Sequence, residues 1–197
     1  MIKEKDTVTK EERSLLETLD KIVRSEKIGA QILPIVERVR ADLERKRTAL
    51  MAWESIPLEI FGDGLPLSIK SGWVFILHAG ADTGAERHPN SHQRMMTFGG
   101  TGDMQTDIKS VKNDVESQSE IEWQSNVLTS DADAPLEARW ISIPQNIWHR
   151  PVIPKGADWA VVSFHTAPAT ELIEERPGAK QMFYLSEQPE AAKTGRD

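Results

Sequence analysis

The sequence predicts a mainly β protein, a sandwich or small barrel that is preceded by two α-helices. Apolar residues recur at helical spacing over roughly the first 50 positions. From about residue 56, short runs with strand character alternate with turns such as Gly-Asp-Gly and Pro-Lys-Gly-Ala-Asp. Five of the six tryptophans fall between Trp73 and Trp159, with Trp53 just before them. Many short strands at nearly regular spacing are typical of sandwiches and small barrels.

The first helix is expected to begin at a capping box, because Thr9 is followed three residues later by Glu12. Gly29 and Pro34 interrupt the helical pattern, and Pro34 fits best in the first turn of a second helix, where its missing N–H is tolerated. The two apolar stripes are Leu15, Leu16, Leu19, Ile22 and Val23, and then Ile35, Val36, Val39, Leu43 and Leu50.

The expected strands occupy seven short runs, and the last segments of the chain carry weaker signals. Residues 179–185 are predicted to form one more strand or a packing segment, and residues 186–197 a mobile tail. This organisation predicts a helical extension over 1–52, a β domain over 53–170 and a C-terminal segment over 171–197. The predicted strands are 65–69, 72–80, 92–98, 103–108, 120–128, 138–144 and 158–166.

Composition excludes several classes of protein. The formal net charge of −7 argues against a nucleic-acid binder, which needs clustered Lys and Arg. The absence of cysteine excludes disulfides and thiolate metal sites. Apolar runs approaching 18 residues are absent, so no membrane span is expected. The charged N-terminal stretch lacks the apolar region of a signal peptide, and we therefore expect a cytoplasmic protein.

One glycine-flanked stretch, GADTGAERHPNSHQRMMTFGGTG, brings together Glu86, His88 and His92. Glu86 and His88 share a face if this segment is extended. His92 lies beyond a Pro-Asn-Ser turn that can bring the chain back toward them. Imidazole and carboxylate groups are ligands for Fe(II), Mn(II), Zn(II), Ni(II) and Co(II), so the spacing indicates a metal site.

The same stretch resembles the cupin family. The first cupin motif is Gly-x5-His-x-His-x3-Glu-x6-Gly, and this chain keeps its frame from Gly80 to Gly99. Glu86 stands where the first His is usual, and His92 stands where Glu is usual. The inventory of two His and one Glu is unchanged.

The second cupin motif, Gly-x5-Pro-x-Gly-x2-His-x3-Asn, is kept in part. Pro144 and His149 have the family spacing. Ala138, Asn146 and Ile153 stand where Gly, Gly and Asn are usual. The resemblance covers roughly residues 56–168 and implies a double-stranded β-helix, the jelly-roll barrel of cupins.

The resemblance implies one divalent transition metal per chain, held by Glu86, His88, His92 and His149. Iron(II) is favoured, and Mn, Zn or Ni accept the same ligands. The alternative is a degenerate barrel whose histidines only form hydrogen bonds in the core.

Further candidates lie close to this stretch. Counting by two from Glu86 places His78 on the same face, as a partner for a metal-ligating histidine or as a core histidine bonded to backbone. His165 at the end of a strand has the same two interpretations. Arg94, two residues beyond His92, would point inward, either to anchor a substrate carboxylate or to form an ion pair.

The function implied by this resemblance is that of a metal-dependent enzyme acting on a small organic molecule. Non-haem Fe(II) dioxygenase chemistry is the first interpretation, because two or three His and one carboxylate leave open positions on iron. A metal-dependent lyase or isomerase is the second, and a non-enzymatic ligand-binding or sensing cupin the third. Cupins commonly pair through their sheets, so we expect a homodimer that binds neither nucleic acid nor membrane.

Overall fold

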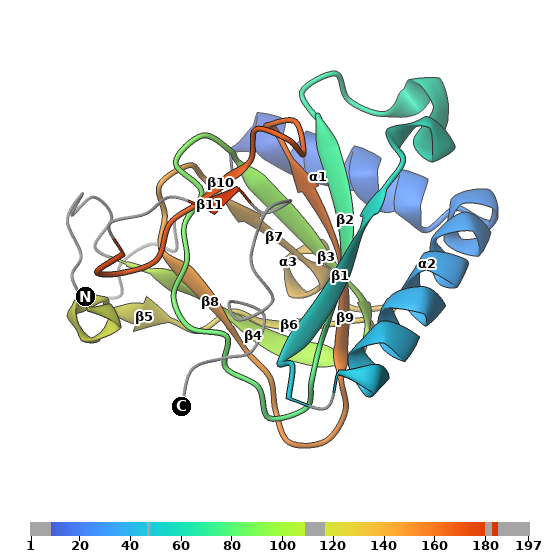
Figure 1. Ribbon diagram of the computed structural model, residues 1–197. Coiled ribbons are helices and arrows are strands. Elements are labelled where there is room, and N and C mark those ends of the chain that lie inside the picture. The colour runs from blue at the N-terminus through green and yellow to red at the C-terminus, as the bar shows by residue number, and fades with distance from the viewer. Residues whose placement is uncertain (1–8, 47, 109–116, 180–182, 185–197) are drawn as a thin grey trace.

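A computed structural model describes residues 9–46, 48–108, 117–179 and the backbone of 183–184 (Figure 1). Two helices, α1 (Lys10–Val23) and α2 (Glu26–Arg45), come first, as predicted. Short helical turns occur at η1 (Leu58–Gly64), η2 (Gln118–Glu120) and α3 (Leu136–Arg139). The predicted tail, 186–197, lies outside the described residues.

The first helix begins as expected, but its cap differs from a complete capping box. The hydroxyl of Thr9 accepts the backbone N–H of Glu12 at 3.2 Å. The carboxylate of Glu12 instead bonds Arg94 on the barrel. The cap residue therefore starts the helix, while Glu12 joins the helix to the β domain.

The predicted start of the second helix was wrong. The break between helices falls at Arg24 and Ser25, and the hydroxyl of Ser25 caps the backbone N–H of Ile28. Pro34 therefore lies inside α2 and not in its first turn. A buried stripe on α2 packs against the barrel and offsets the hydrogen bond lost at proline. The helix ends at Arg45, so Leu50 is not part of it.

The β domain contains two antiparallel sheets, which confirms the predicted mainly β fold. In the first sheet the strand order is β1-β2-β9-β3-β7, and in the second β5-β4-β6, with β8 also paired to β4. A further two-stranded sheet pairs β10 with β11. The strands are β1 (Met51–Ile56), β2 (Ser71–Leu77), β3 (Gln93–Gly99), β4 (Thr101–Asp107), β5 (Trp123–Gln124), β6 (Val127–Thr129), β7 (Trp140–Ile143), β8 (His149–Val152), β9 (Trp159–His165), β10 (Ile173–Glu174) and β11 (Phe183–Tyr184).

Three strand predictions need correction. Residues 65–69 form no strand, since Pro66 lacks an N–H for a ladder and Leu67 is exposed. The first strand is β1, which lies across the expected boundary between the extension and the β domain. Strand β8, which begins at His149, was not among the predicted runs.

The two sheets and the helices form successive layers. Apolar residues of β1, β2, β3 and β9 face those of β4 and β6 in the barrel core. The opposite face of the first sheet packs against α1 and α2 (Figure 1). On β3, Met95 faces the barrel core and Met96 faces the helices. The strands therefore alternate between an interior face and a face that the helices cover.

One close contact between the sheets requires a glycine. The indole of Trp159 lies directly against Gly102 on β4, and a Cβ there would meet the Trp159 ring at 2.2 Å. Trp159 is completely buried and donates a hydrogen bond from Nε1 to Thr97 Oγ1 at 3.1 Å. The ring has no room to retreat, so this contact permits no side chain at residue 102.

Candidate metal centre

The extended segment 86–88 pairs on one side with His149 at the beginning of β8 and on the other with Glu175, which directly follows β10. Glu86 and His149 exchange two backbone hydrogen bonds of 2.8 Å each, so their side chains are direct neighbours. On the other edge, Arg87 and Glu175 exchange backbone hydrogen bonds of 3.1 and 3.0 Å. Because the segment is extended, Glu86 and His88 point to the same side, as predicted.

Glu86, His88 and His149 form a three-residue group suited to a metal ion. One ligand atom from each lies within 4.8 Å of the other two. His88 Nδ1 lies 2.8 Å from the carbonyl oxygen of Ile173, and His149 Nδ1 lies 3.0 Å from that of Ile147. Each Nδ1 therefore carries the proton that it donates to backbone, and each Nε2 keeps its lone pair for a metal.

The surroundings of His149 Nε2 support this fit. This atom is fully buried and has no hydrogen-bond partner among the described residues. It lies 3.5 Å from Glu86 Oε1. When His149 is neutral, a nitrogen lone pair and a carboxylate oxygen face each other there, which is unfavourable unless a cation or a proton lies between them. Two imidazoles and one carboxylate are a donor set for Fe(II), Mn(II) or Zn(II).

The protonation states also suit a metal. Burial lowers the pKa of His88 to about 4, so its ring is neutral at pH 7. Although burial alone would raise it, the pKa of Glu86 is held below its usual range, in part by the positive charge of the Arg176 guanidinium. Glu86 therefore supplies a negative charge and His88 a neutral nitrogen.

Arg176 orients Glu86. Its Nη2 donates to Glu86 Oε2 at 3.0 Å and lies 2.8 Å from Glu174 Oε1, while its Nη1 donates to the carbonyl of Thr83 at 2.7 Å. One guanidinium thus bridges two carboxylates. Glu86 Oε1 remains directed toward His149.

The structure separates His92 from the predicted ligand set. Residues 89 and 90 form a turn, and the backbone of His92 pairs with Thr166 at the end of β9. The side chain of His92 points to the helix-covered face, where Nε2 lies 2.7 Å from Ser142 Oγ and 3.6 Å from Glu12 Oε1. The residue spacing of the cupin motif is kept at His92. The turn, however, places the His92 side chain on the helix-covered face and not on the interior face.

Arg94 shares this outer face, which contradicts its predicted inward direction. Its Nε and Nη2 donate to Glu12 at 2.7 and 2.8 Å, the ion pair that was the alternative to a substrate anchor. Gln93 and Met95, the neighbours of Arg94 on the strand, line the pocket instead. The error has one cause, because a parity count that starts at His92 begins on the wrong face.

His78 also lies away from the metal centre. It follows β2, is one-third exposed, and its Nδ1 is 3.2 Å from Asp158 Oδ1. The irregular stretch between His78 and Glu86 includes a turn and a bridge to β8, so counting by two across it does not hold.

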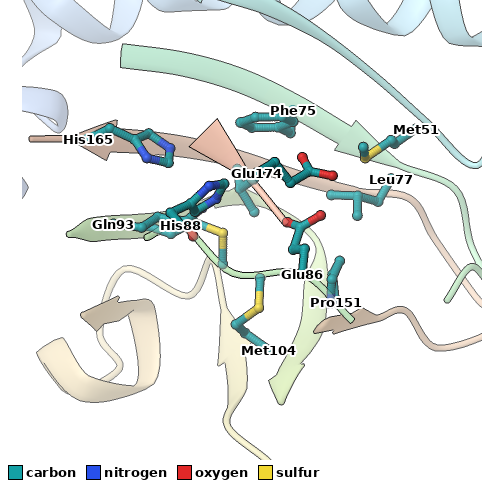
Figure 2. A pocket seen from close by; sticks show the side chains of 12 residues that line it. Met51, Phe75, Leu77, Glu86, His88, Gln93, Met104, Pro151, His165 and Glu174 are labelled. Atoms are coloured by element: carbon teal, nitrogen blue, oxygen red, sulfur yellow. The ribbon is translucent and has the colours of Figure 1, made fainter. Parts of the chain in front are cut away.

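The pocket beside the metal group has mostly apolar walls. Its cavity is about 30 Å³, roughly the space of one water molecule. In the view of Figure 2, His88 and His165 lie together toward one end, and the carboxylates of Glu86 and Glu174 toward the other. A substrate larger than a few atoms would require the flexible methionine side chains to move. The lining residues are Met51, Phe75, Leu77, Glu86, His88, Gln93, Met95, Met104, Pro151, Val161, His165 and Glu174.

His165 is completely buried beside His88. The two rings meet edge to face with centroids 5.1 Å apart. Burial and the neighbouring His88 hold the pKa of His165 well below its usual range. Both of its nitrogens contact serine hydroxyls, so it is not directed at the metal group.

The chain after residue 170 supports the site, which sequence reasoning missed. Asn90 Nδ2 donates to the carbonyl of Glu171, and its Oδ1 accepts the N–H of Ile173. Ile173 in turn supports His88, and Arg176 supports Glu86. No motif marks these residues, because their roles arise from a bridge between segments 85 residues apart.

A larger cavity, about 330 Å³, lies between the α1–α2 junction and the outer face of the first sheet. Arg24, Glu26 and Arg139 are its charged lining residues. Arg139 is already paired with Asp20. The three metal-ligand-type residues therefore lie at the smaller pocket, and the larger cavity is not the candidate metal centre.

In the part of the chain that the structure describes, no helix is both long and apolar enough to cross a membrane. No protein-family model matches the sequence, and no curated protein matches it significantly. The antiparallel sheets agree with the β architecture that the resemblance to cupins implies.

Solved structures show a distant likeness. Oxalate oxidase in complex with the substrate analogue glycolate is 12% identical, with a TM-score of 0.42, and the match covers 70% of this chain and 56% of that one. The capsular polysaccharide assembling protein CapF from Staphylococcus aureus is 11% identical, with a TM-score of 0.46, over 65% of this chain and 30% of that one. Pumpkin seed globulin is 16% identical, with a TM-score of 0.44, over 66% of this chain and 28% of that one. This chain therefore spans about half of the oxidase and a third of the others, and such remote likeness carries no information on activity.

Proposed function

We propose that this protein is a mononuclear metal enzyme of the cupin type, which acts on a small organic molecule at the centre formed by Glu86, His88 and His149. The observation that supports the proposal most strongly is the geometry of the two histidines. Each is fixed through Nδ1 to a backbone carbonyl, which leaves Nε2 for a metal beside an ionised carboxylate.

Fe(II) is the metal that we favour. Two histidines and one carboxylate match the donor set of non-haem iron oxygenases. When bound, iron at such a centre supplies redox chemistry with dioxygen and open positions for a substrate. We therefore propose dioxygenase-type chemistry as the first function.

The chain's own residues would have separate tasks in that reaction. Glu86 balances charge through Oε1 while Arg176 holds Oε2. His88 stays neutral because of its burial. The walls formed by Phe75 and Met104 exclude water from the pocket, which strengthens electrostatic interactions within it (Figure 2).

A metal-dependent lyase or isomerase is the second candidate, and Glu174 favours it. This carboxylate lines the pocket, is 1% exposed and contacts the same Arg176 guanidinium as Glu86. A second carboxylate beside a Lewis-acidic metal could move a proton on the substrate. Arg94 is already paired with Glu12, so it no longer supports a substrate carboxylate bound at that residue.

Metal analysis of variants tests the centre. Wild-type protein should bind about one equivalent of Fe(II) or Mn(II), and His88→Ala and His149→Ala should lose it. His92→Ala is the matched control, because it is the same substitution in the same motif, and it should retain the metal. Metal loss in His92→Ala with retention in His149→Ala would contradict the centre.

Turnover then separates the candidate functions. Oxygen consumption by the iron-loaded protein with a panel of small organic molecules would support the dioxygenase. Turnover without oxygen would support the lyase or isomerase, and should be lost in Glu174→Gln. A protein that binds no metal would instead be a ligand-binding cupin. We also propose a homodimer, and a monomer by light scattering at micromolar concentration would refute it.

A further inference from the structure

Gln93 has an incompletely bonded amide at the wall of the metal pocket. It is 5% exposed, and its Nε2 lies 3.1 Å from Ser163 Oγ. Its Oε1 is buried and has no hydrogen-bond partner among the residues that the structure describes. An unpartnered buried polar atom costs free energy, so it points to a ligand that is bound only during function.

The position of Gln93 distinguishes it from other such atoms. Trp73 Nε1, Trp148 Nε1 and Arg94 Nη1 are also buried and unpartnered within the described ranges, but these residues do not line the pocket. Gln93 lines it together with His88 (Figure 2).

A line of polar groups continues from Gln93 away from the pocket. Ser163 Oγ lies 3.1 Å from His165 Nε2, and His165 Nδ1 lies 3.4 Å from Ser91 Oγ. All four side chains are buried. A half-turn of the Gln93 amide exchanges its oxygen and nitrogen, so either end can meet Ser163. The directions of the other hydrogen bonds decide whether the amide oxygen or the amide nitrogen of Gln93 faces Ser163.

That direction is set at Ser91. Its Oγ accepts the backbone N–H groups of Thr166 at 3.0 Å and Ala167 at 3.3 Å. Both lone pairs of the hydroxyl are then used, so Ser91 cannot also accept a proton from His165. A proton on His165 Nδ1 would therefore be a buried donor facing a saturated hydroxyl. The single hydroxyl proton of Ser91, which also lies within reach of the His92 carbonyl oxygen at 3.3 Å, can instead be donated to Nδ1, so the neutral ring is more stable with its proton on Nε2.

The remaining bonds follow from this tautomer. His165 Nε2 donates to Ser163 Oγ. Among the described residues the other partner of this hydroxyl is the Gln93 amide, so the hydroxyl proton of Ser163 is directed to Gln93. Only the oxygen of the Gln93 amide can accept that proton. The amide NH2 is left facing the pocket.

We propose that Gln93 is a positioning residue whose amide NH2 donates a hydrogen bond to an acceptor oxygen of the metal-bound substrate. This inference rests on the proposed metal centre and deepens it. The substrate class is then a small molecule with a carboxylate or carbonyl oxygen, and not one that offers only donors at this position.

Formate is a suitable probe, because it is the smallest carboxylate and only accepts hydrogen bonds. Co(II)-loaded wild type, Gln93→Leu and Gln124→Leu are titrated with formate, and the visible absorption of Co(II) reports binding. Gln124 is exposed on β5, so Gln124→Leu is the matched control. All three proteins should hold one equivalent of Co(II), because Gln93 is not a ligand. Gln93→Leu should bind formate about tenfold more weakly, the effect of losing one hydrogen bond to a charged group.

Equal or tighter formate binding by Gln93→Leu would overturn the inference, because an amide oxygen facing the pocket would repel a carboxylate. If Gln93→Leu does not fold, Gln93→Met repeats the test with an unbranched side chain of similar length. If wild type takes up no Co(II), the proposed metal centre fails on its own. Gln93 is then tested in the metal-free protein labelled with ¹⁵N-glutamine. A saturable shift of its side-chain NH2 signal with formate supports the contact, and an unmoved signal refutes it.

Discussion

Glu12 connects the first helix to the barrel through a mostly buried ion pair, and Glu12→Ala tests its role. The carboxylate accepts hydrogen bonds from Arg94 Nε at 2.7 Å, Arg94 Nη2 at 2.8 Å and Ser142 Oγ at 2.6 Å. Arg94 is only 5% exposed, so removing Glu12 leaves a nearly buried cation without its carboxylate. We expect Glu12→Ala to lower the free energy of unfolding by about 3–5 kcal/mol.

Two further variants isolate this effect. Glu12→Ala combined with Arg94→Met removes both charges and should recover a large part of the loss, because no buried cation remains. Glu17→Ala breaks an exposed pair with Arg13 on the same helix and should change the free energy of unfolding by less than about 1 kcal/mol.

Urea unfolding at pH 7, followed by tryptophan fluorescence, measures these differences. A loss below about 1 kcal/mol for Glu12→Ala would refute the reasoning. Metal content should be unchanged in Arg94→Met, since Arg94 faces the helices and not the metal pocket.

Three further outcomes are expected. Gly102→Ala forces a Cβ into the buried Trp159 ring and should destabilise the protein by roughly 3 kcal/mol or prevent folding, whereas Gly156→Ala, which meets open space, should be nearly neutral in chemical denaturation. Asn90→Ala releases the backbone carbonyl that orients His88 and should weaken metal affinity by roughly 10–100-fold in a chelator competition, with little change in thermal stability. Because burial lowers the pKa of His88 to about 4, its ring should stay neutral as pH falls from 7 to 5; a His88 ring that titrates near pH 6.5 in NMR spectra of the metal-free protein would contradict this.

The fold could be predicted largely from local patterns. Helical spacing located α1 and α2, and alternating runs located β2, β3 and β9. The errors arose where a long-range contact overrides a local signal. Pro34 is accommodated inside α2 because the helix is held by the barrel, and β1 was missed because its pairing with β2 is not visible in its own residues.

The candidate site was predictable only in part. The spacing of Glu86 and His88 and the later His149 correctly indicated three neighbouring ligand-type groups. His92 was misplaced because one turn shifts strand parity, and a motif written as a linear spacing does not encode that turn. The role of Arg176 could not be predicted, because no residue near it in the sequence indicates its contact with Glu86.

The support of His88 and Glu86 by Ile173 and Arg176 has a consequence for how the molecule is made. During synthesis, the helices and the first sheet can form before the last of these residues leaves the ribosome. The centre cannot acquire its final shape until then, because His88 must wait for a carbonyl made 85 residues later. Metal capture would then follow the synthesis of residues 173 and 176. A chain that stops short of residue 176 would lack the groups that orient His88 and Glu86, and we expect it to bind metal more weakly.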